Sequence, residues 1–325
     1  MTALLARWAE CVFWLARYVE RVENLARILE VQETFARDSR GRHDWGMVLA
    51  INADTGCFLA RGTLPTAENV LRFYVIDRDN PTSIWSALHA ARENARALRP
   101  LISTEMWIQL NVFYNRIAAL GPADVVEERV ARLCAMIKEG CDTHAGITAG
   151  TFYRDEASCF YQLGAAIECA DQTTRLLDAK LLGMPQGGDG DAGGAADAAY
   201  WTALLRSAVG YQAFRRRHPR GMVAEQVAAF LISDPCFPRS VACNIGIVAE
   251  QLERLRRHYG LRPAAAALER VEAIEDTLEV RKVRALMATG GVHRFNDHLQ
   301  ASLIDLTRLL GRSFFGHPPS GADAA

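Results

Sequence analysis

Charged side chains concentrate near the N-terminus, in the stretch RYVERVENLARILE at residues 17–30. On a helix it brings six polar residues within three turns, namely Arg17, Glu20, Arg21, Glu23, Asn24 and Arg27. Glu20 and Asn24 stand four positions apart, as do Glu23 and Arg27, so each pair can interact on a helix face. Carboxylates beside guanidiniums could bind a charged ligand, or act as acid and base if burial raised one pKa. Three interpretations of this stretch remain: a buried polar clamp, a ligand or catalytic site, and a solvated helix face. The pattern favours the clamp.

A second stretch repeats part of this polar set 148 positions further on, with Glu168, Asp171, Gln172 and Arg175. It carries Cys169 where the first stretch has an arginine. Burying an unpaired charge is costly, so buried carboxylates and guanidiniums need partners. We therefore expect the two helices to supply each other in a crossed network of glutamate and arginine.

A third polar segment, ALHAARENARALR at residues 87–99, adds a basic element with Arg92, Glu93, Asn94 and Arg96. Two arginines four positions apart repel each other on a helix unless an anion or carboxylate lies between them. A phosphate or carboxylate clamp is one interpretation of this segment. A basic surface stripe is the other, and the pattern favours it.

The elements that must position these residues are predicted to be helices throughout, because alternating β-branched runs are missing and helix formers dominate. Asp155 is a candidate cap for the helix that follows it. Residues 183–199 are rich in Gly, Ala and Asp and are predicted to form a surface loop, and residues 316–325 a disordered tail. The predicted helices cover about 3–37, 43–61, 66–77, 82–99, 103–120, 123–146, 155–182, 198–217, 222–233, 239–260, 264–288 and 291–315.

An internal duplication is the strongest pattern in the chain. Trp45 and Phe58 match Trp201 and Phe214 at an offset of 156, and further markers follow in the same order at 157. Two repeats of this length indicate two similar helical halves rather than a solenoid. We expect one compact all-α domain, a multi-helix bundle with a first half at 1–182, the loop at 183–199 and a second half at 200–315. The duplication itself begins near residue 150.

Composition excludes several classes of function. A formal net charge of −1 gives no global attraction to nucleic acid or to a membrane surface, and no apolar run approaches the roughly 20 residues of a spanning helix. Eight cysteines without a CxxC pair indicate reduced thiols in a cytoplasmic protein. Cys141 and His144 lack a second ligand pair, so we expect no metal site and no cofactor.

The segments FWLARYVERVENLAR, NPTSIWSALHAARENARALR, STEMW and FPRSV, in this order, resemble the alpha-E family of bacterial all-helical proteins, named for a Glu-Arg motif. Here that motif is Glu20-Arg21, and the resemblance extends from about residue 10 to 310. The sequence departs from the family at Cys169, where the second copy usually carries Arg, and at 244–246. Both departures favour Glu20 and Arg21 as the better-kept site.

The resemblance implies a context rather than an activity. Such proteins are typically encoded beside circularly permuted ATP-grasp ligases and transglutaminase-like peptidases, which would be the partners. We therefore expect an accessory or scaffold protein of a system that forms or processes peptide or amide bonds, and that docks an enzyme or a peptide. Its binding residues would be Arg17, Glu20, Arg21, Glu23, Asn24, Arg27, Arg92, Glu93, Asn94, Arg96, Asp171 and Arg175.

The alternative is an enzyme in its own right. An amide ligase or hydrolase would use a cleft lined by Glu20, Arg21 and Glu168. The sequence leaves open whether the chain performs chemistry, and favours a non-catalytic role. A pocket with empty space in front of the polar side chains would support the enzyme, whereas side chains bonded only to each other would support the clamp.

Overall fold

The computed structural model describes residues 4–38, 44–182, 193–288 and 291–318, and within these ranges every regular element is a helix. This confirms the all-α class expected from the sequence. No helix in the described ranges combines the length and apolarity that crossing a bilayer requires. All eight cysteines are free thiols.

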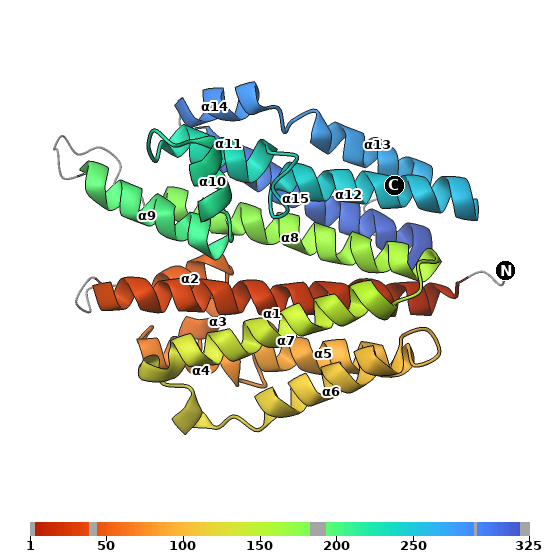
Figure 1. Ribbon diagram of the computed structural model, residues 1–325, viewed down its shortest axis with the longest axis horizontal. Coiled ribbons are helices and arrows are strands. Elements are labelled where there is room, and N and C mark those ends of the chain that lie inside the picture. Colours follow the sequence, from red (N-terminus) through yellow and green to blue (C-terminus); the bar gives the residue numbers. More distant parts are fainter. Residues whose placement is uncertain (1–3, 39–43, 183–192, 289–290, 319–325) are drawn as a thin grey trace.

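Two long helices run through the middle of the molecule, α1 (Ala6–Asp38) and α8 (Glu156–Leu182), packed against each other. Helix α1 also packs on α5 (Ile84–Ala97) and α7 (Val130–Thr151), and α8 on α12 (Val241–Tyr259) and α15 (Val292–Leu310). Helices α4 to α7 lie on one side of the central pair and α9 to α15 on the other (Figure 1). Arg17 of α1 and Glu168 of α8 are therefore buried in the interior.

The remaining helices cover the flanks of the central pair. They are α2 (Gly46–Ile51), α3 (Thr55–Leu59), α4 (Ala67–Val75), α6 (Thr104–Ala118), α9 (Gly193–Ser207), α10 (Tyr211–Arg217), α11 (Ala224–Ser233), α13 (Ala264–Glu275) and α14 (Val280–Ala288). Short 3-10 turns at Pro122–Asp124 and Glu127–Arg129 precede α7, and a π turn at Gly311–Phe315 follows α15. Asp155 Oδ1 accepts the Ala157 amide at 3.0 Å, which confirms it as the cap of α8.

Helix α1 is covered on both sides, as its sequence pattern indicates. Leu15, Val22 and Leu29 of its apolar stripe are buried, and so are Phe13 and Ile28 beside its polar residues. Gly164 of α8 lies so close to α1 that an added Cβ would stand 2.2 Å from the Phe13 carbonyl oxygen. Only glycine permits this approach of the two helix backbones.

Three predicted helices are interrupted, and those predictions were too long. The segments 43–61, 198–217 and 264–288 each form two helices. Ala53 and Val209 adopt a left-handed φ of 58° at two of the breaks, a conformation that neither residue type signals in a sequence. The helix predicted at 123–146 starts at Val130 and continues to Thr151.

The predicted loop at 183–199 is wrong for its last seven residues, because α9 begins at Gly193. Alanine has the highest helix propensity, and it outweighs the glycines here. Residues 183–192 lie outside the described ranges. Of the predicted tail, residues 316–318 are ordered by a hydrogen bond of 2.8 Å between His317 Nε2 and Glu10 Oε1, and residues 319–325 are not described.

Candidate functional site

Glu168 of α8 is fully buried and is held by two arginines of α1. Arg17 Nε donates to Glu168 Oε2 at 2.7 Å, and Arg21 Nε donates to Oε1 at 2.8 Å. Arg21 Nη2 adds a bond to Oε2 at 3.0 Å, so this arginine grips the carboxylate with two parallel donors. Arg17, Arg21 and Glu168 thus form a buried ion triad that links α1 to α8, an arrangement that the clamp interpretation requires.

The triad fixes the charge of Glu168. Burial alone would raise the pKa of this carboxyl group, but the charges of Arg21 and Arg17 hold its pKa well below the usual range. Arg17 is held further by its guanidinium lying 4.9 Å from the Trp14 ring centroid and by Nη1 donating to Thr307 Oγ1 at 3.2 Å. Glu168 is therefore ionised near neutral pH, and both of its oxygens accept hydrogen bonds.

Glu20 and Glu23 of α1 form a second cluster around Arg239, in the turn that precedes α12. Arg239 Nη1 donates to Glu20 Oε1 at 2.9 Å and to Asn24 Oδ1 at 2.7 Å, and Nη2 donates to Glu23 Oε1 at 2.8 Å. Arg27 also donates to Glu23 Oε1, through Nη2 at 2.6 Å. The two carboxylates together thus receive two guanidinium groups.

The two carboxylates differ in electrostatic balance. Burial raises the pKa of Glu20, against the opposing charge of Arg239. Burial also acts to raise the pKa of Glu23, but Arg239 and Arg27 together lower it below its ordinary value. The negative charge of Glu20 is less fully balanced than that of Glu23, because Glu20 contacts one guanidinium group and Glu23 contacts two among the described residues.

The crossed network expected between α1 and α8 exists in one direction only. Arg175 Nε donates to Asp171 of its own helix at 2.7 Å instead of reaching α1. Alanine and cysteine stand at 165 and 169, which lie 148 positions after Arg17 and Arg21. Since α8 carries no equivalents of these arginines, Arg239 neutralises Glu20 instead. The expectation of reciprocal pairing was wrong for this reason.

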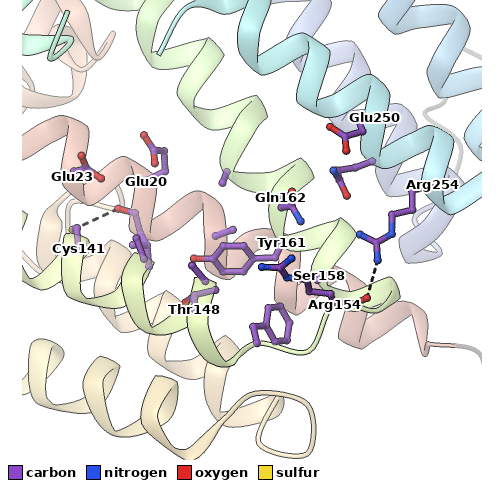
Figure 2. Close-up of a pocket in the computed structure, with 17 residues that line it drawn as sticks. Glu20, Glu23, Cys141, Thr148, Arg154, Ser158, Tyr161, Gln162, Glu250 and Arg254 are labelled. Carbon is purple, nitrogen blue, oxygen red and sulfur yellow. Dashed lines mark hydrogen bonds between the residues drawn. The ribbon is translucent and has the colours of Figure 1, made fainter. Parts of the chain in front are cut away.

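A cleft of about 500 Å³ opens beside Glu20 and Glu23, between α1, α7, α8 and α12. Figure 2 shows Glu20 and Glu23 at one side, Glu250 and Arg254 at the other, and Tyr161, Gln162 and Arg154 between them. Arg254 Nη2 donates to the Arg154 carbonyl oxygen at 2.9 Å, which fixes that guanidinium. The cleft is lined by Ala16, Val19, Glu20, Glu23, Cys141, Ala145, Thr148, Ala149, Phe152, Arg154, Ser158, Tyr161, Gln162, Ala165, Glu250, Gln251 and Arg254.

The predicted site residues therefore separate into groups. Glu20 and Glu23 border the cleft, whereas Arg21 and Glu168 are not among its lining residues and belong to the buried triad. Arg17 lies in the same triad. Asn24 donates a hydrogen bond to Glu20, and Arg27 forms an ion pair with Glu23. Asp171 and Arg175 form an ion pair within α8. Glu20, Arg21 and Glu168 do not line one common cavity in the described ranges.

The Arg92–Arg96 segment lies on α5, away from the cleft. Glu93 bonds both arginines, with Oε1 at 3.1 Å from Arg92 Nη1 and Oε2 at 2.6 Å from Arg96 Nη2. Arg92 Nε also donates to Asn111 Oδ1 at 2.7 Å. The protein's own carboxylate thus occupies the place between the two arginines, and Asn94 does not line the cleft either.

Sequence reasoning did not assign Arg239, Tyr161 or Arg254 to the site. Arg239 lies within FPRSV, and Glu250 and Gln251 lie 157 positions after Glu93 and Asn94, the offset of the expected repeat. This offset could have drawn attention to the α12 residues of the cleft wall. The contact between Arg239 and α1 spans more than two hundred residues and follows no local pattern.

Cys141 and His144 are both buried, as core-lining residues should be. His144 Nδ1 lies 3.1 Å from Gln109 Oε1, and burial lowers the pKa of His144 to about 4. Within the described ranges no group of three or more His, Cys, Asp or Glu side chains is arranged to hold a metal ion.

The fold and the site define a class of helical protein whose first helix carries a Glu-Arg pair. The glutamate of this pair lines a cleft, and the arginine belongs to a buried ion triad. The chain belongs to the Alpha-E family, described as a predicted alpha-helical domain with a conserved ER motif, whose model matches residues 4–315. The family resemblance described above assigns this motif to Glu20-Arg21. No match was found among the curated proteins or among the solved structures.

Proposed function

We propose that this Alpha-E protein is an accessory protein of a system that forms or processes peptide or amide bonds, and that it binds a peptide segment or small amide substrate for a partner enzyme. The partners would be a circularly permuted ATP-grasp ligase and a transglutaminase-like peptidase, as the family resemblance implies. The observation that carries the proposal is the cleft of about 500 Å³ between α1, α7, α8 and α12.

The size and chemistry of the cleft support binding. Ligand sites commonly measure about 300–1,000 Å³ and combine apolar walls with a few oriented polar groups. This cleft has Ala145 and Ala149 on an open wall, with carboxylates, amides and guanidiniums along its length. Neutral polar residues such as Gln162 and Gln251 suit peptide groups, which need both donors and acceptors.

Reconstitution with the ligase tests the role directly. The ligase is assayed for ATP turnover and amide product with and without this chain, and the two proteins are tested for co-purification. We expect product formation to depend on the chain. An equal rate of the same product without it, together with failure to co-purify, would reject the accessory role.

A matched pair of variants shows whether the cleft is responsible. Ala149→Trp fills the cleft from an exposed position of α7 and leaves the Glu20–Arg239 contacts in place. Ala135→Trp adds the same bulk at an exposed position of α7 that is not part of the cleft wall. The first variant should abolish the stimulation of the ligase, and the second should keep it.

An enzymatic role is the second candidate, favoured by the position of Glu20. A partly buried carboxyl group with a raised pKa beside a cleft is suited to general acid–base work. As a hydrolase, Glu20 would take a proton from water while the water oxygen bonds to the amide carbon. It would then pass that proton to the leaving amine. The purified chain should then cleave a peptide amide alone, and Glu20→Gln should not.

We also infer that the two halves arose by duplication, and matching local contacts support this. Arg61 pairs with Asp77 as Arg217 pairs with Asp234. Ser83 Oγ donates to the Asp77 carbonyl oxygen at 2.6 Å, and Ser240 Oγ donates to the Asp234 carbonyl oxygen at 2.5 Å.

Backbone conformation supports the same inference. Ala53 and Val209, which both have a φ of 58°, are 156 positions apart, the offset of the tryptophan and phenylalanine markers. A comparison of the two halves across many family members tests the duplication. Agreement no better than that of shuffled sequences would contradict it.

A further inference from the structure

We propose that the cleft binds a short peptide as a zwitterion, with its free amino group at Glu20 and its free carboxylate at Arg154 and Arg254. This assignment of ligand class and orientation rests on the proposed binding function and deepens it. It excludes internal segments of longer chains, which have no free ends in the cleft.

The acidic side of the cleft, formed by Glu20 and Glu23, has carboxylate oxygens that can accept hydrogen bonds from a ligand. Glu20 Oε1 receives Asn24 and Arg239, while no hydrogen bond to Glu20 Oε2 occurs within the described ranges. Glu23 likewise receives Arg27 and Arg239 on Oε1 alone among the described contacts. A ligand ammonium has three donors and no acceptor, which matches this pair of oxygens.

The basic side lies at the opposite end of the cleft in Figure 2. Arg254 is anchored there by its bond to the Arg154 carbonyl oxygen, at the start of α8. Arg154 has an exposed side chain, and no ion pair with it occurs within the described part of the chain. Glu250 stands one turn before Arg254 on α12, without an ion pair among the described contacts. Among the side chains that line this end of the cleft, two guanidiniums stand against one carboxylate, and this surplus of positive charge suits a ligand carboxylate.

The middle of the cleft offers groups that suit a peptide backbone. Gln251 is 3% exposed and lines the cleft, and within the described ranges its Oε1 has no hydrogen-bond partner. A buried amide oxygen without a donor costs free energy, which a ligand N–H would recover. Gln162 and Tyr161 line the same cleft and lie between Glu20 and Arg254 (Figure 2).

Binding of trialanine to the full chain, measured by isothermal titration calorimetry, tests the proposal through the ends of the ligand. N-acetyl-trialanine lacks the ammonium, and trialanine amide lacks the carboxylate, while both keep the backbone. We expect trialanine to bind and each capped form to bind at least about tenfold more weakly. These comparisons use the unmodified protein, so no folding defect can affect them.

Two variants then assign each end to a residue. In Glu20→Gln the penalty for N-acetylation should disappear while the penalty for amidation remains. In Arg154→Gln the penalty for amidation should shrink, because only Arg254 remains to bind the carboxylate, while the penalty for N-acetylation should stay unchanged. Arg257→Gln, an exposed arginine of α12 outside this cleft, is the matched control and should preserve both penalties.

Absence of trialanine binding, or equal binding of free and capped peptides, would overturn the proposal. A penalty for N-acetylation that persists in Glu20→Gln, together with a penalty for amidation that is unchanged in Arg154→Gln, would overturn the orientation. Failure of the accessory role is separate, because the ligase would then work without the chain even where trialanine binds as described. Loss of end discrimination with ligase dependence intact would reject only the ligand class.

Discussion

Arg239 Nη1 and Glu20 Oε1 lie 2.9 Å apart although 219 positions separate the two residues. The contact brings the turn before α12 onto α1, beside the cleft. Arg239 also bonds Glu23, so one guanidinium joins two carboxylates. The cation thus performs two tasks: it holds the second half of the chain against α1, and it keeps Glu20 partly compensated beside the cleft.

Arg239→Met should destabilise the protein by about 3 kcal/mol, because among the described contacts Glu20 loses its one guanidinium partner and Glu23 loses one of two. The free energy of unfolding is measured by urea titration. Arg257→Met, at an exposed site, should change it by less than about 0.5 kcal/mol. Equal effects of the two substitutions would show that the contact around Arg239 contributes nothing to stability.

Glu168→Gln should cost about 3–5 kcal/mol near neutral pH, because Arg17 and Arg21 lose a buried counter-charge. The folded-state pKa of Glu168 is depressed, so its contribution is present above the unfolded pKa of about 4.3 and is lost as pH falls below it. The stability difference between wild type and variant should therefore shrink at acid pH. Urea titrations of both proteins above and below this pKa measure it, and a constant difference would contradict the prediction.

His144 should make the free energy of unfolding depend on pH between neutral and weakly acidic values. Its folded-state pKa of about 4 lies below the unfolded value, so the unfolded chain binds more protons between these pKa values. Stability attributable to His144 should thus fall by about 2 kcal/mol between about pH 7.5 and pH 5. Unfolding titrations of wild type and His144→Gln test this, and the variant should lack this component. Parallel pH profiles of the two proteins would refute it.

Gly164→Ala should destabilise the protein by about 1–3 kcal/mol or more, because its Cβ would meet the Phe13 backbone at the α1–α8 contact. Gly146→Ala is the matched control, since an added Cβ meets nothing within 4 Å there. Gly146 is an exposed residue of α7, so Gly146→Ala should stabilise the protein by about 0.5–1 kcal/mol through the higher helix propensity of alanine. Thermal melts of both variants check the prediction, which fails if both shift the melting temperature in the same direction.

The sequence alone determined the all-α class, the burial around α1 and the cap at Asp155. These features depend on residues three or four positions apart, whose interactions are local and recur with the helical period. For the same reason the Glu20–Asn24 and Glu23–Arg27 contacts could be read from spacing. Breaks such as Ala53 and Val209 could not, because neither residue type marks a left-handed turn.

Only the tertiary structure decided which arginine neutralises which carboxylate. Glu168 takes Arg17 and Arg21 from α1, but Glu20 takes Arg239 from a turn that spacing alone could not place. Charge pairing acts through space, so it depends on how whole helices pack. The cleft has the same origin, because α1, the consecutive helices α7 and α8, and α12 must come together from distant parts of the chain to enclose it.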